Sequence, residues 1–490
     1  MIPLLSADEM RALEERAIRD WGIPSLVLQE HAAAGALELL PRGQRIQVLA
    51  GPGTNGGDAL ALARLARLRG EWVEVWTLVP EPRWKGDAAL QASLWEGLGG
   101  GYRHVEHPAE ALRGFRGWVV DGILGLGSRL PLSGAAEAWV RALQDAQSLG
   151  DPGFRVLSLD LPTGLDPSSG DGPGPAVRAA VTACFGHLKR CHGLRPARDL
   201  CGEIHIVPIP LNEAPEARVW RMEAPTVADA PWDAHKRERG HVGIRAGTPG
   251  MSGAAVLAAL GALRAGAGLV TVLPDPAVRE EVASQVPEAM VRPWEGQVPE
   301  GVDVLLAGPG GVTEPPAWRG PLVLDASALR PGEGARWLAR PDTVLTPHPG
   351  EFGRLFGEGI LSGRGTDARL AAVGAVASGP GVLVLKGAQS LVAGGGDEAI
   401  LVNGTGHGGL ATGGTGDFLA GMVAAAVGRW ATARGRGDAR PGSLKSAVAE
   451  AVWLHGAAAD RLGPGPLLVR DLGESLQALL RDPGRRPGRD

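Results

Sequence analysis

Gly413-Gly414-Thr415-Gly416-Asp417 continues directly into Phe418-Leu419-Ala420-Gly421-Met422-Val423, an apolar segment that predicts a helix. Glycines let the backbone turn tightly and direct successive N–H groups at one point, and the positive end of the helix adds to the attraction for a phosphate. Asp417 would then accept the proton of an attacking hydroxyl, as in small-molecule kinases. The alternative is a plain turn in which Asp417 complements the helix dipole. The motif alone leaves both interpretations open.

The whole chain has the composition of a globular protein. Its 490 residues, 44% hydrophobic and 21% charged, suffice for two or three domains with sizeable cores. The net charge of -5 gives no reason to expect nucleic-acid binding, so we expect small-molecule partners. No apolar run reaches the roughly 20 residues of a membrane helix, and the N-terminus lacks the pattern of a signal peptide. We therefore expect no membrane association.

The three cysteines, Cys184, Cys191 and Cys201, lie in one stretch without the spacing of zinc ligands. Buried structural thiols are the better expectation for them. An odd number of cysteines in a chain of this length suits a reducing cytosol, so we expect a cytoplasmic protein.

Strands and helices alternate in the first half. Ser6 and Glu9 form a capping box that predicts a helix start. The apolar patterns then predict a strand at 46–50, a loop at 51–58, a helix at 60–68, and strands at 72–79, 118–120 and 156–159. Because the carboxyl ends of parallel strands gather at one edge, we expect Asp58, Asp121 and Asp160 to converge there.

The character of the sequence changes at residues 211–238, which are polar, rich in proline and without periodicity, so we place a domain boundary there. A second α/β series follows, with a helix at 251–267 and strands at 269–273, 302–307, 321–324, 344–346 and 382–385. The strand at 321–324 ends at Asp325. The charged tail from residue 481 to 490 is expected to fray.

The glycine motif at residues 51–56 matches G-x-G-x-x-G between a strand and a helix, which is typical of dinucleotide-binding units. An acidic side chain such as Asp58 beside a pyrophosphate is electrostatically unfavourable, which favours a different use of this loop. Asn55, Asp121 and Thr163 supply hard oxygen donors that together suit a cation such as K⁺. The alternative is that Asp121 and Asp160 only form turns at strand ends.

Three further loops carry candidate ligand contacts. The loop at residues 125–131 is able to present backbone N–H groups and the Arg129 side chain to phosphates, and a flexible connection explains it equally well. His348, between two prolines at a strand end, suits a polar ligand but is equally compatible with a structural role. Lys386 opens a strand-end turn suited to a nucleotide phosphate or base edge.

Taken together, these stretches resemble the bifunctional NAD(P)H-hydrate repair enzymes, in which an epimerase domain is fused to a ribokinase-like dehydratase domain. The resemblance covers nearly the whole chain. The matching stretches are residues 50–58, 121–134, 158–166, 250–270, 308–310, 346–351, 386–390 and 410–421. Several distinct motifs in the same order carry the resemblance, where one alone would not.

The resemblance implies an α/β fold with two domains. The first, residues 1–214, would be a Rossmann-like three-layer αβα sandwich, and the second, residues 222–490, a ribokinase-like α/β domain. The family acts on nicotinamide cofactor to which water has added at C6. The first domain would interconvert the R and S epimers, and the second would dehydrate the S form of NADHX or NADPHX, using ADP in the bacterial type and ATP in the eukaryotic type. The resemblance also implies Mg²⁺ in the dehydratase domain and a homo-oligomer.

The resemblance further implies roles for individual residues. Asp160 is the candidate proton-transfer group of the epimerase, and Asn55, Asp121 and Thr163 would bind K⁺. The epimerase substrate contacts would be Thr54, Asn55, Gly56, Gly57, Asp58, Gly125, Leu126, Gly127, Ser128, Arg129, Leu130, Pro131 and Asp160.

In the dehydratase domain Asp417 would be the base. The hydrated cofactor would contact Ala254, Gly310, His348 and Asp417, and the nucleotide would contact Lys386, Gly387, Ala388, Gln389, Ser390 and Gly416.

The chain departs from the usual family pattern at several positions. Thr54 stands where Asn is usual, Leu126 where Thr is common, and His407 where Asn is common, and residues 29–32 replace the usual Met-Glu-Asn-Ala run. Two alternatives remain at this point. One is a ribokinase-like small-molecule kinase fused to a nucleotide-binding regulatory domain, and the other is an N-terminal half that binds a nucleotide or a protein without catalysis.

Overall fold

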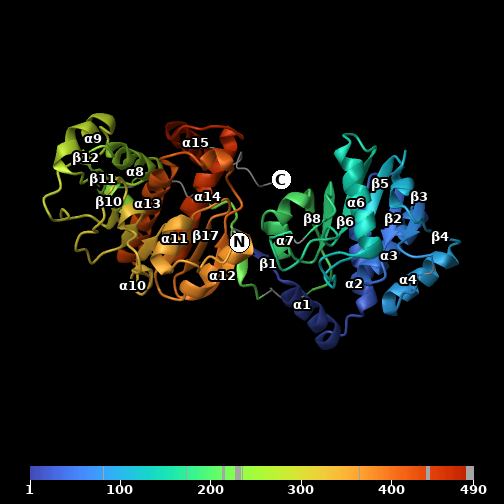
Figure 1. Ribbon diagram of the computed structural model, residues 1–490. Helices are drawn as coiled ribbons and strands as arrows, with labels where there is room; N and C mark the ends of the chain where they lie inside the picture. Colours follow the sequence, from blue (N-terminus) through green and yellow to red (C-terminus); the bar gives the residue numbers. More distant parts are fainter. Residues whose placement is uncertain are drawn as a thin grey trace. The chain divides into compact units, whose positions relative to one another are not determined.

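A computed structural model describes residues 1–80, 82–172, 174–211, 216–226, 233, 235–363, 365–437 and 442–481. The chain folds into two compact units, an N-terminal unit formed mainly by Pro3–Val219 and a C-terminal unit formed mainly by the residues from Trp220 onward (Figure 1). Part of the stretch expected to hold the boundary (212–215, 227–232 and 234) and the tail after residue 481 lie outside the described residues. The domain limits 1–214 and 222–490 stay predictions.

The N-terminal unit has a seven-stranded sheet in the order β4-β3-β2-β5-β6-β7-β8, with every neighbouring pair parallel. Its strands are β2 (Arg45–Ala50), β3 (Trp72–Thr77), β4 (Tyr102–Arg103), β5 (Gly117–Gly122), β6 (Phe154–Leu159), β7 (Val181–Phe185) and β8 (Glu203–Val207). Its helices are α1 (Ala7–Asp20), α2 (Ser25–Glu38), α3 (Thr54–Leu68), α4 (Gly86–Gly97), α5 (Pro108–Leu112), α6 (Gly134–Ser148), α7 (Arg190–Gly193) and the 3-10 turn η1 (Ala197–Leu200).

Helices cover both faces of this sheet. Successive side chains of a strand point to opposite faces, so Val48 packs with α2, α3 and α4, while its neighbour Leu49 packs with α5 and α6. Two buried faces require strands that are apolar throughout, as β2 and β5 largely are. The expected three-layer αβα sandwich is confirmed for this unit.

The expected loop at residues 51–58 is wrong in its second half, because α3 begins at Thr54. Close packing explains the glycines there. A Cβ on Gly56 would lie 1.8 Å from the carbonyl oxygen of Gly51, and one on Gly57 would lie 2.5 Å from Nε2 of Gln29. The glycines therefore let the first turn of α3 pack against its surroundings, and they serve a helix, not an extended turn.

The C-terminal unit contains most of an eleven-stranded sheet in the order β1-β9-β18-β17-β16-β15-β14-β13-β10-β11-β12. Its strands are β1 (Ile2–Leu4), β9 (Val219–Arg221), β10 (His241–Arg245), β11 (Leu269–Val272), β12 (Met290–Val291), β13 (Val304–Ala307), β14 (Leu322–Leu324), β15 (Thr343–Leu345), β16 (Val382–Leu385), β17 (Leu391–Gly394) and β18 (Asp397–Val402). The strands from β10 to β16 are parallel, and β17 and β18 form an antiparallel hairpin that the sequence did not predict.

The helices of this region are α8 (Ser252–Arg264), α9 (Arg279–Gln285), α10 (Gly334–Leu338), α11 (Pro349–Phe356), α12 (Thr366–Val376), α13 (Thr415–Gly435), α14 (Leu444–Leu462) and α15 (Val469–Arg481), with 3-10 turns η2 (Lys236–Arg239), η3 (Pro276–Val278), η4 (Ala326–Ala328) and η5 (Gly408–Leu410). A large core joins α8, α13, α14 and α15 to one face of the sheet. None of the helices in the described part of the chain is long and apolar enough to cross a membrane.

Helices α8 and α13 pack with almost no side chain between them. A Cβ on Gly261 of α8 would lie 2.1 Å from the carbonyl oxygen of Phe418, and one on Gly421 of α13 would lie 2.0 Å from that of Ala258. Both distances are below any real contact, so the two backbones touch directly. This contact sets the position of the first turn of α13, which carries Asp417.

Gly261→Ala tests this close approach. The added methyl group overpacks the contact, and we expect the C-terminal unit to lose about 1–3 kcal/mol of unfolding free energy. The matched control is Gly253→Ala in the same helix, where a Cβ meets nothing within 4 Å. Hydrogen exchange of the α13 amides measures the change in stability in both variants. Equal protection in the two variants would show that the backbones are not in contact.

Candidate active sites

A cavity of about 400 Å³ lies in the N-terminal unit at the carboxyl ends of β2, β5 and β6. The strand order reverses between β2 and β5, which is where doubly wound sheets bind ligands. The cavity is lined by Arg11, Glu14, Gly53, Thr54, Asn55, Asp58, Ile123, Leu124, Gly125, Leu126, Gly127, Ser128, Asp160 and Phe185.

Most of the predicted epimerase contacts line this cavity, and five do not. Thr54, Asn55, Asp58, Asp160 and the loop from Gly125 to Ser128 are brought together. Gly56 and Gly57 are instead buried in the packing of α3, and Arg129, Leu130 and Pro131 lie beyond the part of the loop that faces the cavity. The roles of all these residues stay predictions.

Asp160 and Lys189 form a buried ion pair beside the cavity. Lys189 is fully buried, and its Nζ donates to Oδ1 of Asp160 and, over 2.7 Å, to the carbonyl oxygen of Phe185. The Phe185 N–H donates to the same Oδ1 over 3.2 Å. Burial opposes the charged form of Lys189, but the attraction of Asp160 outweighs it and raises the pKa of the ammonium. Lys189 is therefore charged, and Asp160 is its counterion.

The backbone of Asp160 is unusual, because its φ of +63° lies in the left-handed region. Asp is one of the few residues that adopt this conformation at modest cost. Asp160 is the first residue after β6, and its N–H donates to the carbonyl oxygen of Ala183 over 2.8 Å. The turn holds the carboxylate at the edge of the sheet.

The cysteines near this pair are structural. Cys184, Cys191 and Cys201 are free and buried, as expected from the sequence. Burial raises the pKa of the Cys184 thiol to about 12, so the group stays protonated. Its Sγ lies 3.8 Å from Nζ of Lys189 and contributes only weakly to that side chain.

Asn55, Asp121 and Thr163, the predicted K⁺ ligands, are close to one another. Thr163 donates its hydroxyl to Oδ1 of Asp121 over 2.6 Å and its N–H to Oδ2 over 2.9 Å. The Asn55 amide donates to the carbonyl oxygen of Leu124 over 3.1 Å, and its Oδ1 is buried without a partner in the described part of the chain. Burial raises the pKa of Asp121. The Thr163 hydroxyl also contacts the Leu124 carbonyl oxygen, over 3.2 Å, which links Asn55 to the Thr163–Asp121 pair. An orphaned amide oxygen in this neighbourhood is a donor of the kind that suits a monovalent cation.

Two further carboxyl groups face the cavity. Burial and then Asp160 raise the pKa of Glu14 to about 7. The same two causes, in the same order, raise the pKa of Asp58, although a hydrogen bond from Gln29 opposes them. Sequence reasoning missed Glu14, because α1 was recognised only by its cap and its apolar positions.

The C-terminal unit presents a second group of charged residues at a sheet edge. The parallel strands β14, β15 and β16 are neighbours, and they lead into Asp325, His348 and Lys386. Lys386 donates to Oδ1 of Asp325 over 2.7 Å, and the Thr346 hydroxyl donates to the same atom over 2.8 Å. Asp325 was not among the predicted site residues, although it ends a strand just as Asp160 does.

Asp417 faces this ion pair from the first turn of α13. Burial and then Asp325 raise the pKa of Asp417 to about 7, while Lys386 opposes the rise. A Cβ on Gly416 would lie 3.5 Å from Nζ of Lys386, which places the glycine turn beside the lysine. Gly414 has φ +90° and is the residue directly before α13. The first N–H groups of α13, like those of any helix, have no partner within the helix. This geometry is compatible with the anion site that the opening motif suggested, which stays a prediction.

The remaining predicted dehydratase residues lie along the same edge. His348 caps α11, accepting from the N–H groups of Gly350 and Glu351 at Nδ1. Gly310 follows β13 and has φ +70°, and its carbonyl oxygen accepts from the Thr248 hydroxyl over 2.9 Å. Ala254 lies in the first turn of α8. Gly310 and Ala254 thus flank the point where the strand order reverses between β10 and β13.

The predicted nucleotide segment from Lys386 to Ser390 follows β16. Gly387 and Ala388 are exposed, while Gln389 is buried and its carbonyl oxygen accepts from Nη2 of Arg369 over 2.7 Å. Arg369 also lies where a Cβ on Gly387 would be placed. The exposed middle of the segment is therefore the part available to a ligand.

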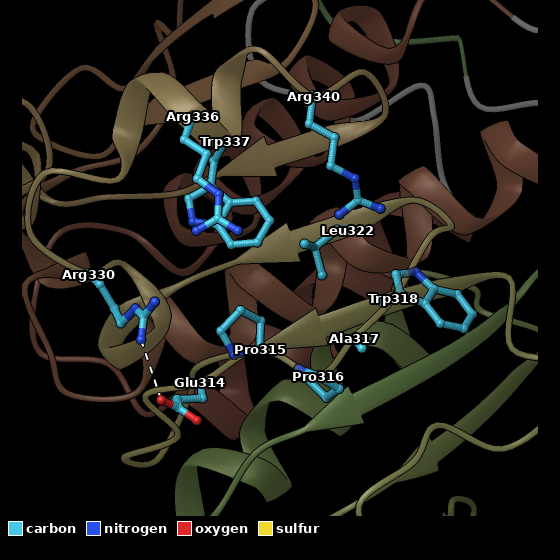
Figure 2. A pocket seen from close by; sticks show the side chains of 10 residues that line it. All are labelled: Glu314, Pro315, Pro316, Ala317, Trp318, Leu322, Arg330, Arg336, Trp337 and Arg340. Atoms are coloured by element: carbon cyan, nitrogen blue, oxygen red, sulfur yellow. Dashed lines mark hydrogen bonds and ion pairs between the residues drawn. The ribbon is translucent and has the colours of Figure 1, made fainter.

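Another cavity, of about 450 Å³, contains none of the predicted residues (Figure 2). Arg330, Arg336 and Arg340 line it together with two tryptophans. Each guanidinium already has a partner: Arg330 contacts Glu333 and Glu314, Arg336 lies 5.1 Å from the ring centre of Trp337, and Arg340 donates to the carbonyl oxygen of Gly320. The structure therefore explains these charges without a ligand.

Comparison with known proteins matches both units. A family model described as NAD(P)H-hydrate dehydratase matches residues 242–472, and one described as YjeF-related protein N-terminus matches residues 26–191. The chain is 31% identical to the bifunctional NAD(P)H-hydrate repair enzyme Nnr of Moorella thermoacetica, over 98% of this chain and 97% of that protein. It is 34% identical to the enzyme of the same name from Coxiella burnetii, over 98% of this chain and 100% of that protein.

The chain belongs to the bifunctional NAD(P)H-hydrate repair enzyme family. This membership confirms the resemblance inferred from the sequence motifs. Among solved structures, the C-terminal half is similar to the ADP/ATP-dependent NAD(P)H-hydrate dehydratase of Bacillus subtilis, crystallised with ATP and Mg²⁺, with 28% identity and a TM-score of 0.43 over 52% of this chain and 94% of that one.

Lys189→Met tests the buried ion pair of this repair enzyme. Removing the ammonium leaves Asp160 buried without its counterion, so we expect a loss of about 3–5 kcal/mol in unfolding free energy. Hydrogen exchange of β6 and β7 in urea measures the loss. The double variant Lys189→Met/Asp160→Asn should recover most of it, and Lys85→Met, at an exposed lysine, should cost little. Equal losses in the single and double variants would contradict the pairing.

Proposed function

We propose that this protein restores NADH and NADPH whose nicotinamide ring has been hydrated at C6. The N-terminal unit interconverts the R and S epimers, and the C-terminal unit removes water from the S form while ADP is converted to AMP and phosphate. Membership of the family supports both activities. The observation that carries the dehydratase assignment is the Asp417 carboxyl, with its pKa near 7, beside Lys386 at a glycine-built anion site.

The chemistry of the C-terminal unit follows from the leaving group. Hydroxide leaves a carbon atom poorly. Asp417 accepts the proton of the C6 hydroxyl while the hydroxyl oxygen attacks the β-phosphorus of ADP. This step releases AMP and forms a phosphate ester at C6. The electron pair of the ring nitrogen then expels inorganic phosphate from C6. Loss of a C5 proton restores the double bond between C5 and C6, so the net result is removal of water.

The other residues of the site bind and orient. The glycine turn from Gly414 to Gly416 directs backbone N–H groups at the transferred phosphoryl group, and Lys386, with its segment to Ser390, holds the nucleotide. Among the described residues, no three His, Cys, Asp or Glu side chains form a cluster able to hold a metal ion. We propose that Mg²⁺ binds together with the nucleotide phosphates beside Lys386, where it would neutralise charge on the transferred group.

In the N-terminal unit we propose Asp160 as a proton-transfer group at C6. Thr54, Asn55, Asp58 and the loop from Gly125 to Ser128 line the cavity that would hold the ring. K⁺ held by Asn55, Asp121 and Thr163 would balance the buried charge of Asp121 next to that cavity. A cytoplasmic location and a homo-oligomer are also predictions. A kinase fused to a regulatory domain shares Asp417 but does not account for the match of the first unit.

The decisive experiment supplies chemically hydrated NADH with ADP, and in a parallel reaction with ATP, and follows the return of dihydronicotinamide absorbance. We expect ADP to restore NADH with release of AMP and phosphate. Asp417→Asn should abolish this step, and Asp160→Asn should leave dehydration of the S form intact while stopping consumption of the R form. If neither nucleotide restores NADH, the dehydratase assignment is wrong.

The pH dependence tests the base. Asp417 must be ionised to accept a proton, so the nucleotide-dependent rate should rise as the pH passes through about 7 and then level off. Because the Asp325 carboxylate raises the Asp417 pKa, Asp325→Asn should move this rise to lower pH. Rates measured from pH 5 to 9 check both statements. A rise that stays in place or moves upward would contradict this role of Asp325.

A further inference from the structure

The cavity of the N-terminal unit carries two carboxyl groups in contrasting surroundings. Asp160 is paired with the Lys189 ammonium through Oδ1, and the Phe185 N–H donates to the same oxygen. Glu14 comes from α1 and lines the same cavity. Within the described residues, the Glu14 carboxyl has no hydrogen bond or ion pair of its own. One group is thus held as a counterion, and the other is left to exchange a proton.

Helix α1 is firmly held against the cavity. The capping box of Ser6 and Glu9 fixes its start, and Met10, Leu13 and Ala17 are buried on its inner face. Arg11 lies one turn before Glu14 on the helix, also lines the cavity, and donates to the carbonyl oxygen of Leu126 over 3.0 Å. Glu14 therefore projects from a fixed helix, on a wall of the cavity different from the one that carries Asp160.

The proposed reaction needs both an acid and a base. The hydrated ring carries a hydroxyl on C6, which is bonded to the ring nitrogen N1. When a base removes the hydroxyl proton, C6 becomes an aldehyde, the C6–N1 bond breaks and N1 takes up a proton from an acid. Rotation about the C5–C6 bond presents the other face of the aldehyde. N1 then adds to the aldehyde carbon C6 and returns its proton to the acid. The C6 oxygen takes back its proton from the base, which restores the hydroxyl group. No electrons are gained or lost.

We propose that Glu14 is the second proton-transfer group of the epimerase, and that it protonates N1 while Asp160 accepts the hydroxyl proton. This inference rests on the proposed function of the N-terminal unit. It assigns the acid to a residue outside the motifs at 50–58, 121–134 and 158–166. Two carboxyl groups whose surroundings separate their protonation states are the usual solution for acid and base in one site.

The charges around Glu14 agree with this role. Burial, Asp160 and Glu15 raise its pKa, to about 7, while Lys189 and Arg11 lower it. Asp58, the other carboxyl group of the cavity, accepts a hydrogen bond from Gln29 and is buried in the first turn of α3. Glu14 is therefore protonated in a large fraction of molecules at neutral pH and loses its proton as the pH rises.

The test measures consumption of the R epimer by the full-length protein, with dehydration of purified S epimer as the internal control. Glu14→Gln should lower R-epimer consumption by about 100-fold or more and leave S-epimer dehydration unchanged. In the wild-type protein, the epimerase rate should fall as the pH rises through about 7, and this fall should be absent from the residual rate of Glu14→Gln. Asp20→Asn, at an exposed position at the end of α1, should keep both activities.

A stability measurement separates chemistry from structure. The folded-state pKa of Glu14 is above its ordinary value, so the group costs stability once the pH rises above that ordinary value. Glu14→Gln should therefore be at least as stable as the wild type at pH 8. A near wild-type epimerase rate in Glu14→Gln, or loss of the high-pH fall in Asp58→Asn instead, would overturn the proposal. If the wild type itself does not consume the R epimer, the proposed epimerase function fails first.

Discussion

A carboxylate removed from water is stabilised by a positive charge nearby, and at each of the two sites a lysine supplies it, fully buried in the N-terminal unit and partly buried in the C-terminal one. Lys189 pairs with Asp160, and Lys386 pairs with Asp325. The chain has only five lysines, and two of them lie at these two sites. In both units the paired aspartate directly follows a central parallel strand. The ion pair fixes the charge at the sheet edge, and the rest of each site is arranged around it.

A second carboxyl group stands beside each pair without a lysine of its own. Asp417 lies in the first turn of α13 and Glu14 lies on α1, so both come from helices and not from strand ends. The negative charge of the paired aspartate acts on each of them and, together with burial, raises its pKa to about 7. Two unrelated sheets therefore reach the same electrostatic arrangement, in which a fixed charge adjusts the proton affinity of a neighbour.

The sequence predicted the parts of the sites that depend on local pattern. Strand ends at Asp160 and Lys386 and the glycine turn before Asp417 follow from periodicity and turn chemistry, and the family motifs placed them in order. Pairings across the fold were not accessible in the same way. Lys189 lies 29 residues after Asp160 in the sequence, and Glu14 lies far before Asp160. Only the folded sheet brings these three residues together at one cavity. The expected loop at residues 51–58 was wrong because glycine signals a turn and close helix packing alike.

The left-handed backbone at Asp160 has a consequence for how this site is able to change. Glycine, asparagine and aspartate are the residues that adopt such a conformation readily. Of these three, only aspartate carries an ionisable group. The main chain therefore restricts the choice of residue before any chemistry is considered, and a longer acid such as glutamate would have to strain the turn to replace it. The other residues that fit this turn readily, glycine and asparagine, have no side chain that titrates, so the backbone leaves aspartate as the one unstrained choice for an acidic group here.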